Sequence, residues 1–346
     1  MYPFAKLDSK KLIVRLSASK VNSRFCLTIA RHAPDHAPMK QLTSTEWISH
    51  FLASDPPRSK SLVMTIFGDS IVPHGGAIWL GSLIEFLAPF GVNDRALRTS
   101  VFRLAQEGWL VANRDGRRSS YAILPEALPR FERAYRRIYD VPTVNWDGKW
   151  TLLMTGPDGL DAPNRASLRK QLLWEGYAMI SPGAFAHPAG DAAVLDEILG
   201  RAGVRDTVYV FSAGAMPDVG SRPLRELVDE AWDLSDVAAG YRNFIEEFAP
   251  LQSLLGERVE PEQAFVIRTL LIHAYRRVQL HDPMLPVELL PQPWPGVEAY
   301  EVARALYLAT CRAAEGYIMA TLQREDADAA PAAESFYQRF GGLPRG

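Results

Sequence analysis

The sequence predicts an α+β protein with three parts. These are a winged helix-turn-helix head over residues 43–140, a ferredoxin-like module over residues 146–214 and an all-helical part over residues 222–346. Three observations predict this architecture. Two short amphipathic helices precede an arginine-tipped hairpin, a β-α-β-β-α-β order follows, and the rest of the chain keeps the 3.6-residue periodicity of helices.

Charge is distributed unevenly along the chain. Residues 1–140 hold 20 Lys and Arg against 12 Asp and Glu, a formal charge of +8. Residues 141–346 hold 18 against 28, a formal charge of −10. This division favours a nucleic-acid-binding head on a sensing and assembly body. The overall composition, 47% hydrophobic and 23% charged, is that of an ordinary soluble globular protein.

Several classes of protein are excluded by what the sequence lacks. Cys26 and Cys311 lie far apart and form no ligand pattern, which predicts a reducing compartment, no disulfide framework and no metal site. No run of about 18 apolar residues occurs, so we expect no membrane-spanning helix. The motifs GxSxG, GxGxxG, Walker A and HExxH are also missing. We therefore expect neither an enzyme nor a cofactor.

Residues 1–42 are rich in Lys, Arg, Ser, His and Pro without sustained periodicity, which predicts a flexible basic extension. Three interpretations compete: a basic arm that touches DNA, an inert tail, or translated sequence upstream of a start at Met39. The last two are favoured, because the family resemblance described below does not cover this segment.

The head is expected to begin with a helix from Ser44 or Thr45 that Pro56 ends, followed by a helix around Leu62. Apolar residues at spacings of three and four then predict a helix over 80–87, which Pro89 and Gly91 break. Asn93 is a good N-cap for the next helix, and Gly108 ends it. Its predicted buried stripe is Leu97, Val101, Leu104 and Ala105.

The outward face of that last helix and the hairpin behind it carry the predicted DNA contacts. Two β-type runs, 109–111 and 121–123, flank the turn signal Asp115-Gly116. In a winged helix the second helix enters the major groove and the wing touches backbone or minor groove. The alternative is that the arginines only keep a surface soluble. The DNA-binding candidates are Arg95, Arg98, Thr99 and Arg103 on the helix and Arg114, Arg117 and Arg118 on the wing.

Seven blocks of sequence resemble one family. They are Phe67-Gly-Asp-Ser70, Gly75-Gly76, Ile78-Trp-Leu-Gly-Ser-Leu83, Arg98-Thr-Ser-Val-Phe-Arg-Leu104, Glu107-Gly-Trp-Leu110, Asp147-Gly-Lys-Trp150 and Phe336-Tyr-Gln-Arg-Phe-Gly-Gly-Leu343. In this order they resemble the PaaX-type repressors of phenylacetate degradation, from about Ser61 to Leu343. The resemblance implies a cytoplasmic, homodimeric transcriptional repressor that binds double-stranded operator DNA and is released by phenylacetyl-coenzyme A. Residue spacing alone does not name that ligand.

The connector over 131–139 is predicted as an amphipathic helix, and the module after it as ferredoxin-like. Strands are expected over 150–154, 177–180, 185–187 and 207–211, with helices over 165–174 and after Asp191. We expect this module to pair subunits. The resemblance implies a Cas2-type fold for it. A nuclease interpretation is disfavoured, because the first strand ends in Met154-Thr155-Gly156 without an early acidic residue.

The remaining chain is predicted to be helical over 225–234, 239–255, 261–280 and 298–322, with a proline-rich loop before the last helix. Candidate effector-binding residues are His273, Arg276, Arg277 and Trp294, because arginines can clamp phosphates and an indole can stack on a ring. The competing interpretation gives these residues structural roles only. Two rival functions also stay open: an acyl-CoA-acting enzyme whose head binds a partner, and a scaffold.

Overall fold

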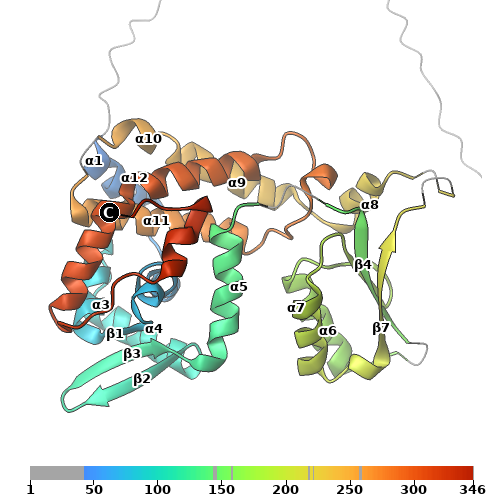
Figure 1. Cartoon of the computed structure of the whole chain (residues 1–346), viewed down its shortest axis with the longest axis horizontal. Coiled ribbons are helices and arrows are strands. Elements are labelled where there is room, and N and C mark those ends of the chain that lie inside the picture. The colour runs from blue at the N-terminus through green and yellow to red at the C-terminus, as the bar shows by residue number, and fades with distance from the viewer. Residues whose placement is uncertain are drawn as a thin grey trace, which may run out of the picture. The chain divides into compact units, whose positions relative to one another are not determined.

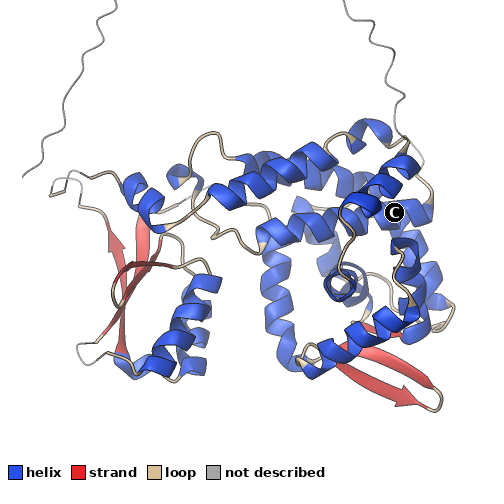
Figure 2. Ribbon diagram, turned by 180° about the vertical axis from the view of Figure 1, so that it is seen from behind, coloured by secondary structure: helices blue, strands red, loops and turns tan. Residues whose placement is uncertain are grey.

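The computed structural model describes residues 43–142, 146–156, 159–216, 219–220, 222–256 and 259–345 (Figure 1). The predicted extension over residues 1–42 lies outside these ranges. Helices and two antiparallel sheets make up the described chain, as Figure 2 shows by colour. The α+β class predicted from the sequence is therefore confirmed. None of the described helices is long and apolar enough to cross a membrane.

The head contains three helices and a three-stranded sheet. Its elements are α2 (Ser59–Ile66), the π-helical turn η1 (Phe67–Ile71), η2 (Val72–His74), β1 (Ala77–Trp79), α3 (Leu80–Leu87), η3 (Ala88–Phe90), α4 (Asp94–Gln106), β2 (Leu110–Asp115) and β3 (Arg118–Ile123). The sheet order is β1-β3-β2, and both pairings are antiparallel. This is the element order of a winged helix. Strand β1 was not predicted, and both hairpin strands are longer than predicted.

The hairpin is longer because polar residues also pair across it. Asp115 pairs with Arg118, so the turn consists of Gly116 and Arg117. Gly116 has a φ of +57°, a conformation that glycine adopts without a steric penalty. The predicted strands covered only the apolar residues of the hairpin, because the prediction relied on hydrophobicity.

The connector and the middle module follow the predicted order. They comprise η4 (Pro125–Ala127), α5 (Leu128–Tyr139), β4 (Lys149–Thr155), α6 (Ala162–Trp174), β5 (Ala178–Ser181), β6 (Ala184–His187), α7 (Ala192–Ala202), η5 (Arg205–Thr207) and β7 (Val208–Gly214). The sheet order β5-β6-β4-β7, antiparallel throughout, is that of a ferredoxin-like fold. Leu153, Leu168, Leu172 and Leu195 belong to a core of its own between sheet and helices.

The remaining helices are α1 (Ser44–Ser54), α8 (Leu224–Ala231), α9 (Ser235–Phe248), α10 (Leu251–Leu254), α11 (Pro261–Gln279) and α12 (Pro295–Gln323). Short turns η6 (Val287–Leu289) and η7 (Glu334–Gly341) complete the chain. The helix predicted over 239–255 is in fact two helices, because Pro250 lacks the N–H that would continue the first. The last helix begins at Pro295, three residues before its predicted start.

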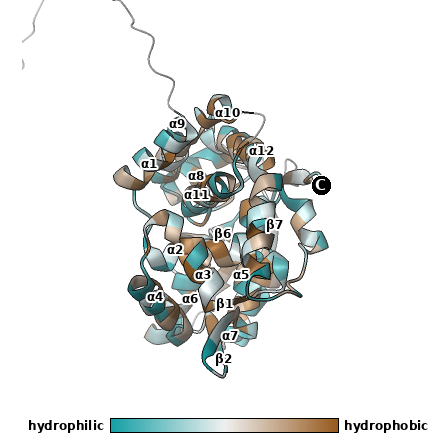
Figure 3. Ribbon diagram, turned by 90° about the vertical axis from the view of Figure 1, so that its left-hand side faces the viewer, coloured by the Kyte–Doolittle hydropathy of each residue, from teal (hydrophilic) through white to brown (hydrophobic). Residues whose placement is uncertain are grey.

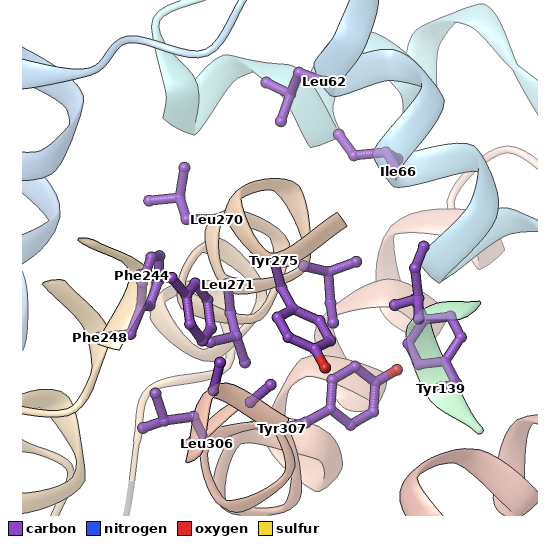
Figure 4. Close-up of a cluster of buried hydrophobic side chains, with 14 of the residues drawn as sticks. Leu62, Ile66, Tyr139, Phe244, Phe248, Leu270, Leu271, Tyr275, Leu306 and Tyr307 are labelled. Atoms are coloured by element: carbon purple, nitrogen blue, oxygen red, sulfur yellow. The ribbon is translucent and has the colours of Figure 1, made fainter. Parts of the chain in front are cut away.

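One hydrophobic core joins the head to the C-terminal helices. Leu62 and Ile66 of α2 lie in the same buried cluster as Leu270 of α11 and Leu306 of α12, which Figure 4 draws together. Trp47 of α1 packs edge-on against Phe248 of α9, with 5.2 Å between the ring centroids. The predicted boundary at residue 140 therefore separates parts of the sequence whose side chains share one core.

Candidate DNA interface and interior cavity

Helix α4 is oriented by its cap and its buried stripe. The Asn93 side chain accepts a hydrogen bond from the Ala96 backbone N–H at 2.9 Å, which satisfies one of the free donors of the first turn. Leu97, Val101 and Leu104 are buried, as the periodicity predicted, whereas Ala105 of the predicted stripe is only half-buried. The opposite face of α4 therefore points into solvent.

The outward face of α4 carries the predicted helix contacts. Arg95, Arg98, Thr99 and Arg103 are all exposed. Only Arg98 has an acidic neighbour among the described residues, Asp94 at 3.8 Å. Phe102 is 60% exposed on the same face, although a phenyl ring in water is unfavourable. Cations beside an apolar ring can contact phosphates, guanine edges and thymine methyl groups.

All three predicted arginines of the wing are exposed, and one of them, Arg118, also has contacts within the protein. Arg114 and Arg117 are exposed, and no carboxylate in the described chain lies within 4 Å of either guanidinium. Figure 3 shows the hydrophilic residues of β2 at the tip of the hairpin. Arg118 instead lies 4.1 Å from the ring centroid of Trp79 and donates to the Glu325 carbonyl at 3.1 Å. Its DNA contact stays a prediction, since the side chain is still 49% exposed.

Glu325 also contacts the first turn of α3. The Ser82 backbone N–H donates to its Oε2 at 3.3 Å, where a helix favours negative charge. A Cβ added at Gly81 would lie 2.8 Å from the Glu325 carboxyl carbon, so glycine leaves room for that carboxylate. Both Gly81 and Ser82 belong to a block on which the family resemblance depends. Their contact with the end of α12 could not be seen in the sequence.

A buried ionic cluster holds the head on the C-terminal helices. Asp69 of η1 is 1% exposed and lies between Arg268 of α11 and Arg339 of η7. Its Oδ2 accepts from Arg268 Nε at 2.8 Å, and its Oδ1 accepts from Arg339 Nη1 at 3.0 Å. The hydroxyls of Tyr139 and Tyr307 donate to Oδ1 at 2.7 and 2.9 Å. We name these five residues the Asp69 cluster.

Electrostatics stabilise the charged form of Asp69. Burial alone would raise its pKa, but the two guanidinium groups and the Tyr139 hydroxyl hold the pKa of the carboxyl below its ordinary value. Arg268 also donates to Glu315 at 2.6 Å, and Glu315 contacts His74 at 3.1 Å. Sequence reasoning assigned Asp69 and Arg339 to family blocks but did not foresee that they meet.

A cavity of about 1200 Å³ that is partly open to solvent lies beside this cluster. Its walls come from α2 of the head, from α5, from α6 of the middle module and from α11. Asp69 and Tyr139 of the Asp69 cluster are among its lining residues. Ion pairs also join the connector to the middle module here, since Arg133 of α5 pairs with Glu175 at 3.5 Å and with Glu197 at 2.9 Å.

The structure brings two of the four predicted effector-binding residues together, because His273 and Arg276 both contact the Thr65 hydroxyl at 2.9 Å. Only Arg276 lines the cavity. Arg277 is exposed and pairs with Asp55 at 2.8 Å. His273 is buried against Thr65, with 2.9 Å between Nδ1 and Oγ1, and burial lowers its pKa to about 4. Trp294 is buried edge-on against Tyr241, at 6.0 Å between ring centroids.

Three family models match the chain, and together they cover more than half of it. They describe a PaaX-like protein at residues 58–126, a PaaX protein central Cas2-like domain at residues 143–228 and a PaaX-like protein C-terminal domain at residues 232–320. Among curated proteins, the transcriptional repressor PaaX of Escherichia coli (strain K12) is 39% identical over 300 residues, 86% of this chain and 94% of that protein. Among solved structures, an uncharacterized protein from Mycobacterium tuberculosis is 23% identical, with a TM-score of 0.48 over 76% of this chain and 98% of that one.

Proposed function

The chain belongs to the PaaX-like family, and we propose that it is a DNA-binding transcriptional repressor of phenylacetate catabolic genes. The observation that carries this proposal is the outward face of α4. There Arg95, Arg98 and Arg103 share the exposed face with the ring of Phe102, beside a wing that presents Arg114 and Arg117. Cations and an apolar ring on one exposed helix face fit the major groove of DNA, where bases offer acceptors and methyl groups.

We assign the proposed DNA contacts to two roles, recognition of base edges and contact with phosphates. Arg98 and Arg103 are assigned to base edges, since they lie on the helix that would enter the groove. Arg114 and Arg117 are assigned to phosphates, which fix the register without reading sequence. Arg118 is assigned to holding the wing against Trp79.

We further propose that the repressor is a homodimer paired through the middle module. Strand β7 lies at the edge of its sheet, and Tyr209, Val210 and Phe211 are all exposed there. An edge strand with exposed apolar side chains is a ready surface for a second copy. Two heads related by a two-fold axis would then contact half-sites about 34–36 Å apart.

Release from DNA is proposed to follow binding of phenylacetyl-CoA. A ligand shifts a conformational equilibrium only by its different affinity for the two states. The bound form must therefore favour a dimer whose heads no longer match the half-site spacing.

Fluorescence anisotropy with DNA from upstream of the gene tests this function. We expect saturable binding that weakens steeply with salt, because counterions are released from phosphates. Addition of phenylacetyl-CoA should release the DNA, and light scattering should give twice the mass of one chain. Failure to prefer the upstream DNA over an unrelated duplex of equal length would rule out the proposed repressor.

A further inference from the structure

We infer that Glu325, just beyond the end of α12, is a positioning residue that holds the wing in the orientation in which it contacts DNA. The inference rests on the proposed function, because it takes the wing to touch DNA. Glu325 and its partner on the wing, Arg118, are 207 positions apart in the chain. The C-terminal helices would thus fix a part of the DNA interface to which they contribute no DNA contact of their own.

The outer part of the wing has little support from the rest of the sheet. Strand β1 pairs with β3 only at residues 120–122. Residues 114–119 therefore form a two-stranded ribbon that projects beyond β1 (Figure 1). A two-stranded hairpin is by itself only marginally stable. Arg114 and Arg117, the proposed phosphate contacts, lie in this ribbon, so their placement depends on what holds it.

Arg118 is the residue through which the ribbon is held. Its guanidinium lies 4.1 Å from the ring centroid of Trp79, a placement that attracts a cation to the indole face. Nη2 donates to the Glu325 carbonyl at 3.1 Å and lies 3.7 Å from Oε2 of the same residue. An exposed ion pair alone contributes little. Here the carbonyl, the carboxylate and the indole all act on one guanidinium, so they restrict it together.

Glu325 can hold the wing because it is itself fixed to α3. Its Oε2 accepts from the Ser82 backbone N–H at 3.3 Å, in the first turn of that helix, where negative charge is favoured. The Ser82 hydroxyl donates to the Thr321 carbonyl of α12 at 3.3 Å. Arg324 pairs with Glu85 of α3. The end of α12 is therefore a fixed point against which Arg118 is held.

Gly81 gives a second way to move the Glu325 carboxylate. An alanine Cβ at this position would lie 2.8 Å from the carboxyl carbon, too close for both to stay where they are. Alanine otherwise favours a helix more than glycine does. Gly81→Ala should therefore displace the carboxylate without changing the charge of the protein.

Fluorescence anisotropy with the upstream DNA, at one salt concentration, tests the inference. Glu325→Ala is compared with Arg324→Ala, because both side chains connect the end of α12 to α3 but only Glu325 contacts Arg118 among the described residues. We expect Kd to rise about threefold to tenfold in Glu325→Ala and to stay within about twofold of wild type in Arg324→Ala. Long-range electrostatics alone predicts the opposite order, since loss of a carboxylate favours DNA and loss of a cation disfavours it.

A double-mutant cycle links Gly81 to Glu325. Gly81→Ala alone should raise Kd about as much as Glu325→Ala does, and should change Kd by less than about twofold when Glu325 is already alanine. Additive losses in the double variant would contradict the idea that Gly81 acts through this carboxylate.

Hydrogen exchange of the DNA-free protein separates positioning from a general loss of stability. Amides of residues 113–120 should exchange at least about threefold faster in Glu325→Ala than in wild type or Arg324→Ala, because the ribbon opens locally more often. Amides of α4 should exchange at the wild-type rate. Faster exchange throughout the head would instead mean that Glu325 only stabilises the fold, and would overturn the inference.

Equal or tighter DNA binding by Glu325→Ala would also overturn the inference, and tighter binding would mean that Glu325 withholds Arg118 from DNA. Either result leaves the proposed repressor intact. A wild-type protein that does not prefer the upstream DNA overturns the proposed function, and hydrogen exchange then decides by itself whether Glu325 holds the wing.

Discussion

Two groups of arginines in this protein differ in burial and in whether a carboxylate lies beside them. Arg268 and Arg339 are 0% and 1% exposed and are compensated by Asp69. Arg103 and Arg117 stand in solvent without a described carboxylate nearby. The fully buried guanidinium groups of Arg268 and Arg339 depend on their counter-charge and hydrogen bonds, whereas an exposed guanidinium keeps its hydration until a ligand replaces it. The first group stabilises the fold, and the second is the group proposed to contact DNA.

The largest effect should come from breaking the buried group. Asp69→Ala leaves two guanidinium groups and two tyrosine hydroxyls without their shared acceptor. Removing one partner of a buried ion pair typically costs about 3–5 kcal/mol, because the remaining charge stays buried. We expect a loss of this size in the free energy of unfolding, measured by urea denaturation.

Asp55→Ala is the matched control for an exposed ion pair. In the wild-type protein the Asp55 carboxylate pairs with Arg277 at 2.8 Å, but both side chains are more than half exposed. Exposed pairs contribute about 0–1 kcal/mol. Equal losses of stability in Asp69→Ala and Asp55→Ala would contradict the distinction between the two groups.

Buried histidines that lack a counter-charge should stay neutral, which predicts a pH dependence. His187 accepts from the Ala189 N–H through Nδ1 at 2.9 Å and donates through Nε2 to the Pro283 carbonyl at 2.8 Å. Burial lowers the pKa of His187 from 6.5 to about 4. The folded state therefore resists protonation, so stability is complete above pH 6.5 and falls as the pH drops towards 4.

His187→Gln should reduce the slope of unfolding free energy against pH in this window by up to about 1.4 kcal/mol per pH unit. His273, whose pKa is also lowered to about 4, should account for a similar part of the slope. Urea titrations at several pH values between 4 and 6.5 measure it. An identical slope in wild type and His187→Gln would show that this imidazole is not kept neutral by the fold.

Within the exposed group, substitutions on α4 and on the wing should affect DNA binding differently. Arg98→Ala should weaken operator binding by about 1–3 kcal/mol and relax preference at one base pair, as loss of a base-edge contact does. Anisotropy titrations against operators with single base-pair changes measure both quantities. An Arg98→Ala protein with undiminished sequence preference would assign this side chain to phosphate.

The smallest effect is expected at the tip of the wing. Arg117→Ala should weaken binding to all sequences alike and reduce the salt dependence by about one phosphate contact. Titrations at four salt concentrations give the slope, with Arg98→Ala measured in parallel. If the two variants had the same slope and the same specificity, the division between reading and positioning would be wrong.

Local pattern was sufficient for most elements of this protein, but it missed β1 and the division between α9 and α10. The cap at Asn93, the stripe of Leu97, Val101 and Leu104, and the order of strands and helices over 146–214 were all predictable. Such features depend on residues within a few positions of one another, through periodicity and capping. The exposure of the α4 arginines follows in the same way, because a helix with one buried face must present the other.

The partners of the buried charged side chains were decided by tertiary structure. Asp69 and Arg339 are 270 positions apart, and no local pattern joins them. Arg276 and Arg277 are adjacent and were treated alike, yet one turns inward to α2 and the cavity while the other pairs with Asp55 at the surface. The physical reason is that local periodicity sets which face of a helix each residue occupies. What covers that face, and hence the charge and solvent that a side chain meets, depends on how distant elements pack.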